Sequence, residues 1–276
     1  MLFKTILTVI GSKEGEADLN RAIEFATQLG AHLTVLAVDV ATPPVLSDYP
    51  VDVLWLEQRT AEMKTLHAAA DKAQAACQVA GIPFDLERYY TEGGLIAEVI
   101  FRKALYSDLV LIGEKVRASN DLLRAIVDGA VFEAQRPLLV LPKNDALPAT
   151  IKTVLLAWNS RAEAGRATRE AIEFLAQADV VHVAVVDPDA AYSENGGEPG
   201  ADVAAFLDRH GVDVTVHQIA SGGRPVQDVL AQYAADLGAD LIVMGAYGHS
   251  RMRERIFGGV TQSMLESPPV PVFMAR

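Results

Sequence analysis

The stretch SGGRPVQDVLAQYAADLGADLIVMGA, residues 221–246, carries the clearest evidence for the architecture, because its pattern occurs twice in the chain. Its counterpart is EGGLIAEVIFRKALYSDLVLIGE, residues 92–114. Both stretches have a pair of glycines, an amphipathic segment with helical spacing, an aspartate, a short apolar run and a further glycine. This order predicts a helix followed by a buried parallel strand in each half.

The remainder of each half repeats the same alternation of strand and helix. The runs KTILTVI from Lys4 and KTVLLAW from Lys152 predict a first strand, and a polar turn and an apolar-periodic helix follow each. We therefore expect an α/β fold with two tandem Rossmann-like domains, each a five-stranded parallel sheet flanked by helices. The polar, proline-containing segment KNDALPAT places the boundary, which gives domains at 1–146 and 147–276.

Composition narrows the class of protein. The 276 residues are 50% hydrophobic and carry a net charge of −12, which argues against general nucleic-acid binding. No apolar run reaches the ~18 residues of a membrane helix, and the N-terminus does not resemble a signal peptide. The single cysteine, Cys77, excludes an internal disulfide. We expect a cytoplasmic protein with neither a nucleic-acid nor a membrane partner.

A glycine-rich loop, GAYGHSRMRERIFGGVTQSML, follows the last strand of the opening stretch and covers residues 245–265. Ligands of open parallel sheets bind at the carboxyl ends of strands, and glycines let the backbone approach them closely. The N-terminus of a helix that follows such a loop suits phosphate. The spacing alone allows two interpretations. The segment is either a phosphate-binding loop or an ordinary connector with solvated basic side chains.

The spacing Gly245-x2-Gly248-x9-Gly258, followed by a small residue, resembles the ATP-binding loop of the universal stress protein family. The order of elements matches that family in both halves, so the resemblance covers essentially the whole chain as a tandem. It implies the family's Rossmann-like (adenine nucleotide alpha hydrolase-like) fold. The family includes nucleotide binders and non-binders. For the second half the resemblance implies an adenine nucleotide, ATP, ADP or AMP, with or without Mg²⁺.

The resemblance also implies which residues contact the nucleotide. Asn159 stands where the family has an acidic residue that contacts the adenosine part, and Val185 and Met244 stand beside the adenine. Gly259 stands where the family usually has a serine or threonine, whose hydroxyl donates to phosphate. We expect the Thr261 hydroxyl to take over that role. The full set is Ala157, Asn159, Val185, Met244, Gly245, Gly248, His249, Arg251, Gly258, Gly259, Val260 and Thr261.

The first half departs from the family pattern. Ile10 stands at the acidic position, and in the segment GEKVRASNDLLRAIVDGAV Val116 replaces the second glycine. Three basic residues of that segment, Lys115, Arg117 and Arg124, still offer positive charge. We expect a degenerate domain that holds a different ligand or only buries surface against its twin.

Other motifs do not support catalysis. There is no Walker sequence and no G-x-S-x-G turn, and the histidines lack metal-binding spacing, although a pair such as His210 and His217 can still meet in space. Asp187 to Asp189 suit either Mg²⁺ or an ordinary loop. We assign no catalytic residue and no metal ligand, and expect at most slow ATP hydrolysis, since Asn159 cannot act as a general base.

Two functions remain open from the sequence. In the first, a tandem universal stress protein binds an adenine nucleotide in its C-terminal domain and acts as a regulator or sensor in the stress response. In the second, the chain is a scaffold without nucleotide that presents a surface or cavity to a protein or lipid-like ligand. The resemblance further implies that the final strands, RPLLVLPK and PVPVFMAR, pair the two halves as an intrachain pseudo-dimer, and it favours a homodimer.

Overall fold

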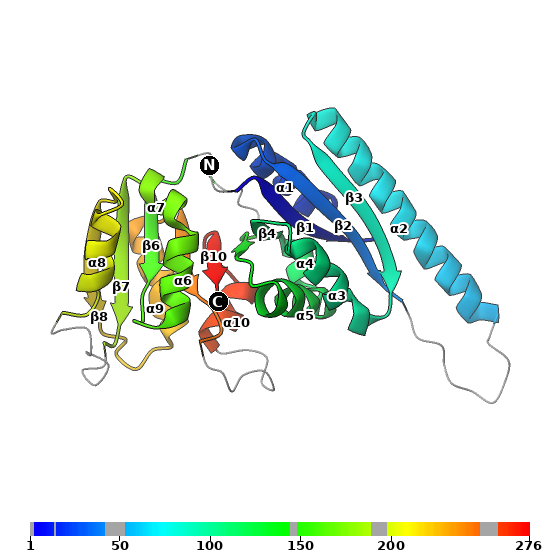
Figure 1. Cartoon of the computed structure of the whole chain (residues 1–276). Coiled ribbons are helices and arrows are strands. Elements are labelled where there is room, and N and C mark those ends of the chain that lie inside the picture. Colours follow the sequence, from blue (N-terminus) through cyan, green and yellow to red (C-terminus); the bar gives the residue numbers. More distant parts are fainter. Residues whose placement is uncertain are drawn as a thin grey trace. The chain divides into compact units, whose positions relative to one another are not determined.

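The structure is a computed structural model, and it describes residues 3–13, 15–41, 53–143, 148, 150–188, 198–248 and 259–276. The chain divides into two compact units, Met1–Arg136 and Pro137–Arg276, and each is considered by itself (Figure 1). No helix within the described ranges combines the length and the apolarity needed to cross a membrane.

Unit 1 alternates strands and helices as the repeat predicts. Its elements are β1 (Thr5–Gly11), α1 (Glu16–Leu29), β2 (His32–Val40), α2 (Val53–Ala80), β3 (Phe84–Thr91), α3 (Gly93–Ala104), β4 (Leu109–Ile112), α4 (Glu114–Arg117), α5 (Asn120–Ile126) and the π-helical segment η1 (Val127–Glu133). The strands of this unit lie in the order β3-β2-β1-β4, and every neighbouring pair is parallel.

The long helix α2 packs on β2 and β3 through one stripe of its surface (Figure 1). The stripe consists of Leu66, Ala70, Ala73 and Cys77, all buried and spaced by three or four residues, as an amphipathic helix requires. Cys77 is therefore a packing residue, as the sequence indicates.

Unit 2 contains the complete five-stranded parallel sheet. Its elements are β5 (Leu138–Val140), β6 (Thr153–Ala157), α6 (Ala162–Glu170), α7 (Ile172–Gln177), β7 (Val180–Val186), α8 (Ala201–Asp208), β8 (Val214–Ile219), α9 (Val226–Leu237), β9 (Leu241–Gly245), α10 (Gly259–Glu266) and β10 (Val272–Ala275). The parallel strands lie in the order β10-β9-β6-β7-β8.

The strand β5 departs from the repeat in the way it pairs. It ends the first repeat in sequence but belongs to unit 2, where it pairs antiparallel with β10. The register sets Val140 opposite Val272 and Leu138 opposite Met274. The expected pairing of the two final strands is confirmed, and unit 1 keeps four parallel strands among its described residues.

The aspartate of the repeated stretch has the same role in both units. Asp108 accepts hydrogen bonds from the backbone N–H groups of Lys4 and Thr5 at 2.7 and 2.9 Å. Asp240 accepts from Lys152 and Thr153 at 2.7 and 3.0 Å. Each carboxylate thus fixes the start of the first strand beside the start of the fourth, which explains why the repeat carries an aspartate there.

Candidate functional site

The carboxyl ends of β6, β7 and β9 bring several of the predicted residues together. Ala157, the last residue of β6, lies in register with Met244 on β9 and with Ala184 on β7. Val185 follows on β7, and both Val185 and Met244 are 4% exposed. These apolar groups form the floor of the edge at which α/β proteins bind ligands.

The backbone at this edge adopts an uncommon conformation. Ser160, Asp187 and Tyr247 follow β6, β7 and β9 closely, and each has a positive φ, at 57°, 45° and 58°. Left-handed backbone at a residue other than glycine is uncommon, and such strain gathers at functional sites. Three neighbouring strand ends therefore share a feature typical of a binding edge.

A carboxylate that sequence reasoning missed lies at the centre of this edge. Glu163, in the first turn of α6, accepts a hydrogen bond at 3.3 Å from the Asn159 side-chain amide. Asn159 in turn accepts from the backbone N–H of Arg161 at 3.1 Å, which shapes the turn before α6. The four-residue separation of Asn159 and Glu163 was the available signal, because it matches one turn at the start of a helix.

The Glu163 side chain lies directly on the glycines of the candidate loop. A Cβ atom on Gly248 would lie 1.9 Å from Oε1 of Glu163, and one on Gly245 would lie 2.6 Å from its Cγ. Only glycine fits at these two positions while Glu163 stays there. The contact with Glu163, a side chain of the same unit, is therefore sufficient to explain why glycine stands at positions 245 and 248.

The second part of the candidate loop begins α10. No heavy atom of the described residues lies within 4 Å of the position that a Cβ on Gly259 would take. Val260 is half-buried, and Thr261 is buried at 7% exposure. His249, Arg251 and Gly258 lie outside the described residues.

Asp187 stabilises a turn. Its Oδ1 accepts a hydrogen bond at 2.8 Å from the backbone N–H of Ser221, the residue that follows β8 closely. Hydrogen bonds from the Ser221 hydroxyl and N–H hold the pKa of the Asp187 carboxyl below its ordinary value. Asp189 lies outside the described residues, and within the described part no three histidines, cysteines or carboxylates gather as a metal site.

The equivalent place in unit 1 is filled by the protein itself. Asp18 of α1 is 2% exposed, and its Oδ2 accepts the backbone N–H groups of Lys115 and Val116 at 2.9 and 3.1 Å. A Cβ atom on Gly113 would lie 2.1 Å from Cγ of Asp18. The backbone donors that follow β4 are therefore already bound to an internal carboxyl group.

The segment of unit 1 that follows β4 is helical, and two of the three basic residues expected to offer positive charge there, Lys115 and Arg124, are exposed. Arg117 is buried at 8% exposure, and burial lowers the pKa of its guanidinium. A Cβ on Gly129 would lie 2.3 Å from the Ala97 carbonyl oxygen, so this glycine permits close packing of η1 on α3. Arg117 and Gly129 thus contribute to the core of unit 1.

Both halves of the chain match one known protein family. The model of the universal stress protein family matches residues 2–142 and again residues 150–276. The chain belongs to the universal stress protein family. It carries two family domains in tandem, as the sequence predicts.

Individual universal stress proteins match this chain over different shares of its length. One from Synechocystis is 25% identical over 182 residues, and the match covers 61% of this chain but only 58% of that relative, less than two thirds of its length. The crystal structure of one from Archaeoglobus fulgidus has a TM-score of 0.67 at 17% identity and covers 98% of this chain and 96% of that one. A putative one from Pseudomonas aeruginosa has a TM-score of 0.60 at 18% identity, with coverages of 99% and 93%. These structures share the fold.

Unit 1 of this universal stress protein contains a cavity that the sequence did not locate. It has a volume of about 520 Å³ and lies between α1, α2 and the end of β1. Its apolar wall includes Ile10, Leu19 and Ala69. Lys72 and Glu16, which also line the cavity, form an ion pair at 3.0 Å between α2 and α1.

Two histidines are in contact on the sheet of unit 2. They are His182 and His217, whereas the sequence suggested His210 and His217. His182 Nδ1 and His217 Nε2 are hydrogen-bonded at 2.9 Å, and the Tyr233 ring lies edge-on to His217 at 5.5 Å. Burial, and then the charge of His217, lower the pKa of His182. His210 instead contacts the Phe206 carbonyl at 2.9 Å.

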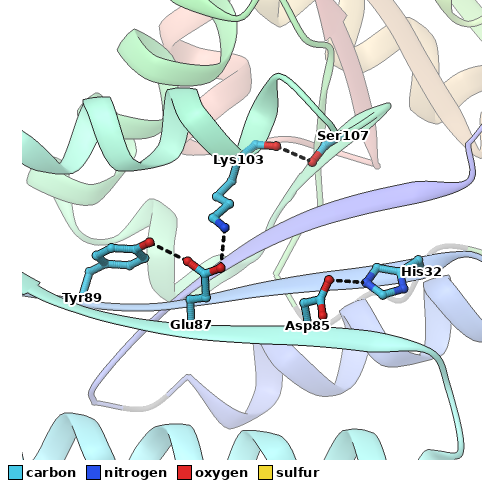
Figure 2. Close-up of polar contacts among 6 residues, drawn as sticks. All are labelled: His32, Asp85, Glu87, Tyr89, Lys103 and Ser107. Carbon is cyan, nitrogen blue, oxygen red and sulfur yellow. Dashed lines mark hydrogen bonds and ion pairs between the residues drawn. The ribbon is translucent and has the colours of Figure 1, made fainter.

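A polar cluster covers the edge strand β3 of unit 1. Figure 2 shows the Glu87 carboxylate between the Tyr89 hydroxyl and the Lys103 ammonium, and it also shows Asp85 paired with His32. The distance from Asp85 Oδ2 to His32 Nε2 is 3.0 Å. Lys103, followed by Tyr89, holds the pKa of Glu87 below its ordinary value. Charged side chains of this kind protect an edge strand from pairing with other chains, so we interpret the cluster as structural.

Proposed function

We propose that unit 2 binds an adenine nucleotide, ATP, ADP or AMP, and that the protein acts as a regulator or sensor in the stress response. The observation that carries the proposal is the register of β6, β7 and β9, which aligns Ala157 with Met244, the residue before Gly245, and with Ala184, the residue before Val185. The family resemblance puts the adenine end of the nucleotide on these residues. Its phosphates then approach Gly248 and the N-terminus of α10, which favours anions.

The proposal excludes the same use of unit 1. There Asp18 already binds the N–H groups of Lys115 and Val116 and covers Gly113. A phosphate at that position would have to displace a buried carboxylate that holds two hydrogen bonds. We therefore propose one nucleotide per chain.

The proposal extends to Mg²⁺ and to the rate of ATP hydrolysis. A bound nucleotide brings its own charge to a Mg²⁺ ion, which needs few protein ligands beyond phosphate oxygens. Asn159 carries no charge and cannot accept a proton from water. We propose that nucleotide serves as a switch or a stable occupant and that hydrolysis is slow.

Gly259 offers a clean test. None of the described residues lies near its Cβ position, so Gly259→Asp leaves the described packing intact and puts a carboxylate at the N-terminus of α10. Gly94→Asp is the matched control, because Gly94 is equally open at the N-terminus of α3 in unit 1. Calorimetry with ATP should show binding to the wild type and Gly94→Asp, and binding to Gly259→Asp weakened about tenfold or more, since like charges repel in a partly desolvated site. Equal affinities for all three would contradict the site.

The cavity in unit 1 favours a second function, that of a scaffold that presents a cavity to an apolar ligand. A largely apolar cavity of about 520 Å³ is within the range of small-molecule sites. Ala69→Trp fills the cavity, whereas Ala75→Trp places the same ring on an exposed part of α2. This second function predicts that an apolar fluorescent dye binds the wild type and Ala75→Trp and not Ala69→Trp. Equal dye binding by both variants would refute it.

Location and assembly complete the proposal. We place the protein in the cytoplasm, since its one cysteine is buried as a free thiol, which suits a reducing compartment. We propose that the paired strands β5 and β10 make the tandem an intrachain pseudo-dimer and that two chains form a homodimer, as the family resemblance suggests. Light scattering that gives the mass of one chain would refute the homodimer.

A further inference from the structure

Glu163 lies in contact with Gly248, at the end of the sheet where the candidate site lies. The Gly248 Cβ position would be 1.9 Å from Glu163 Oε1 and 2.5 Å from its Cδ, so the carboxylate fills the space that a side chain on Gly248 would need. The same side chain passes over Gly245, where a Cβ would be 2.6 Å from Glu163 Cγ. Any group that approaches these two glycines from that side meets a negative charge.

Few contacts among the described residues hold this carboxylate in place. Within that part of the chain it accepts one hydrogen bond, at 3.3 Å, from the neutral amide of Asn159, and its side chain is half-buried. Its position in the first turn of α6 adds the modest attraction of a helix N-terminus. A single long hydrogen bond from a neutral donor is weak, so the carboxylate can leave when a competing group arrives.

Unit 1 shows the permanent form of the same arrangement. Asp18 also lies against the glycine that follows the fourth strand, but it is 2% exposed and accepts two backbone hydrogen bonds. In both units, therefore, an acidic side chain of the helix after the first strand covers glycine at the end of the fourth strand, Asp18 at Gly113 and Glu163 at Gly245 and Gly248. In unit 1 it is fixed by those bonds, and in unit 2 it can be displaced.

From this geometry we infer that Glu163 is a built-in competitor for the phosphate groups of the nucleotide in unit 2. The inference rests on the proposed function and concerns the regulation of that site. Phosphate and carboxylate cannot both lie on Gly248, and their charges repel across a short distance in a partly desolvated edge. Glu163 therefore weakens binding in proportion to the negative charge of the ligand, and it sets a preference for less charged adenine ligands.

The test compares ligands of increasing charge on two matched variants. Glu163→Gln keeps the shape and removes the charge, and Asp228→Asn removes the charge of an exposed carboxylate in the first turn of α9. Calorimetry in EDTA measures adenosine, AMP and ATP binding to the wild type and both variants. We expect Glu163→Gln to bind ATP about tenfold more tightly and AMP by a smaller factor. Adenosine affinity should not change, and Asp228→Asn should match the wild type.

The outcomes separate this inference from the proposed function. A gain in ATP affinity that shrinks with added salt supports it, as does ATP binding that appears only in Glu163→Gln. Equal ATP affinity in the wild type and Glu163→Gln overturns the inference and leaves the site. Weaker binding to Glu163→Gln also overturns it, because Glu163 then contacts the ligand. No binding to the wild type, Glu163→Gln or Glu163→Ala, all shown to be folded by circular dichroism, overturns both.

Discussion

The Asp18 carboxylate fills the space that a side chain on Gly113 would need, since a Cβ atom there would lie 2.1 Å from Cγ of Asp18. We predict that Gly113→Ala lowers the free energy of unfolding by about 1–3 kcal/mol, the usual cost of overpacking. Urea denaturation measures it. In an Asp18→Gly background the same change should cost much less, because Cγ, Oδ1 and also Cβ of Asp18, which would lie 2.6 Å away, are all gone. Additive effects of the two substitutions would contradict the contact.

Asp18 also makes a prediction about pH. Burial raises the pKa of the Asp18 carboxyl, and the hydrogen bonds from Val116 and Lys115 offset this only in part. The folded protein therefore binds this proton more tightly than the unfolded chain, so ionisation of Asp18 costs stability as pH rises from the ordinary value of 3.8 to the raised pKa. Asp18→Asn removes that cost and keeps an acceptor oxygen.

Denaturation curves between pH 4 and 7 compare the two proteins. The stability of Asp18→Asn relative to the wild type should rise with pH and then level off above the raised pKa. Asp121→Asn is the control, because Asp121 is an exposed carboxylate in the first turn of α5. A stability difference that does not vary with pH would contradict the raised pKa.

The histidine pair of unit 2 predicts the opposite dependence on pH. Burial, followed by the His217 charge, lowers the pKa of His182 in the folded protein. The unfolded chain then binds this proton more readily, so the stability contributed by neutral His182 is lost as pH falls below the ordinary value of 6.5. His182→Gln should reduce the pH dependence of unfolding between pH 7.5 and 5.5. An equal replacement at the exposed His210 should leave the dependence unchanged, and equal slopes for all three proteins would refute the assignment.

Much of the fold was predictable because it depends on local pattern. Short apolar runs predict β4 and β9 as buried strands from composition alone. An aspartate, Asp108 or Asp240, precedes each run. The repeat then fixes the order of the elements. The transfer of β5 to unit 2 was only partly predictable, since it depends on pairing with β10, a strand at the far end of the second repeat.

The site was less predictable, because its decisive contacts join distant segments. The glycine spacing after β9 stays a prediction of a phosphate-binding loop, whereas the structure does bring Ala157, Val185 and Met244 to neighbouring strand ends. The roles of Glu163 and Asp18 could not be predicted, because each packs against a glycine that is distant in sequence. Gly113 looked like a remnant of a phosphate loop until its contact with Asp18 gave it a packing role.

The number of nucleotides bound per chain tests the central claim most directly. Native mass spectrometry of the intact protein, titrated with ATP, counts bound ligands without assuming where they lie. The Asp18 carboxyl group occupies the equivalent place in unit 1, whereas at the start of α10 no described residue lies near the Cβ position of Gly259. Together these predict one ATP per chain, lost in Gly259→Asp and kept in Gly94→Asp. Two ATP per chain, or none with either ATP or AMP, would contradict the account.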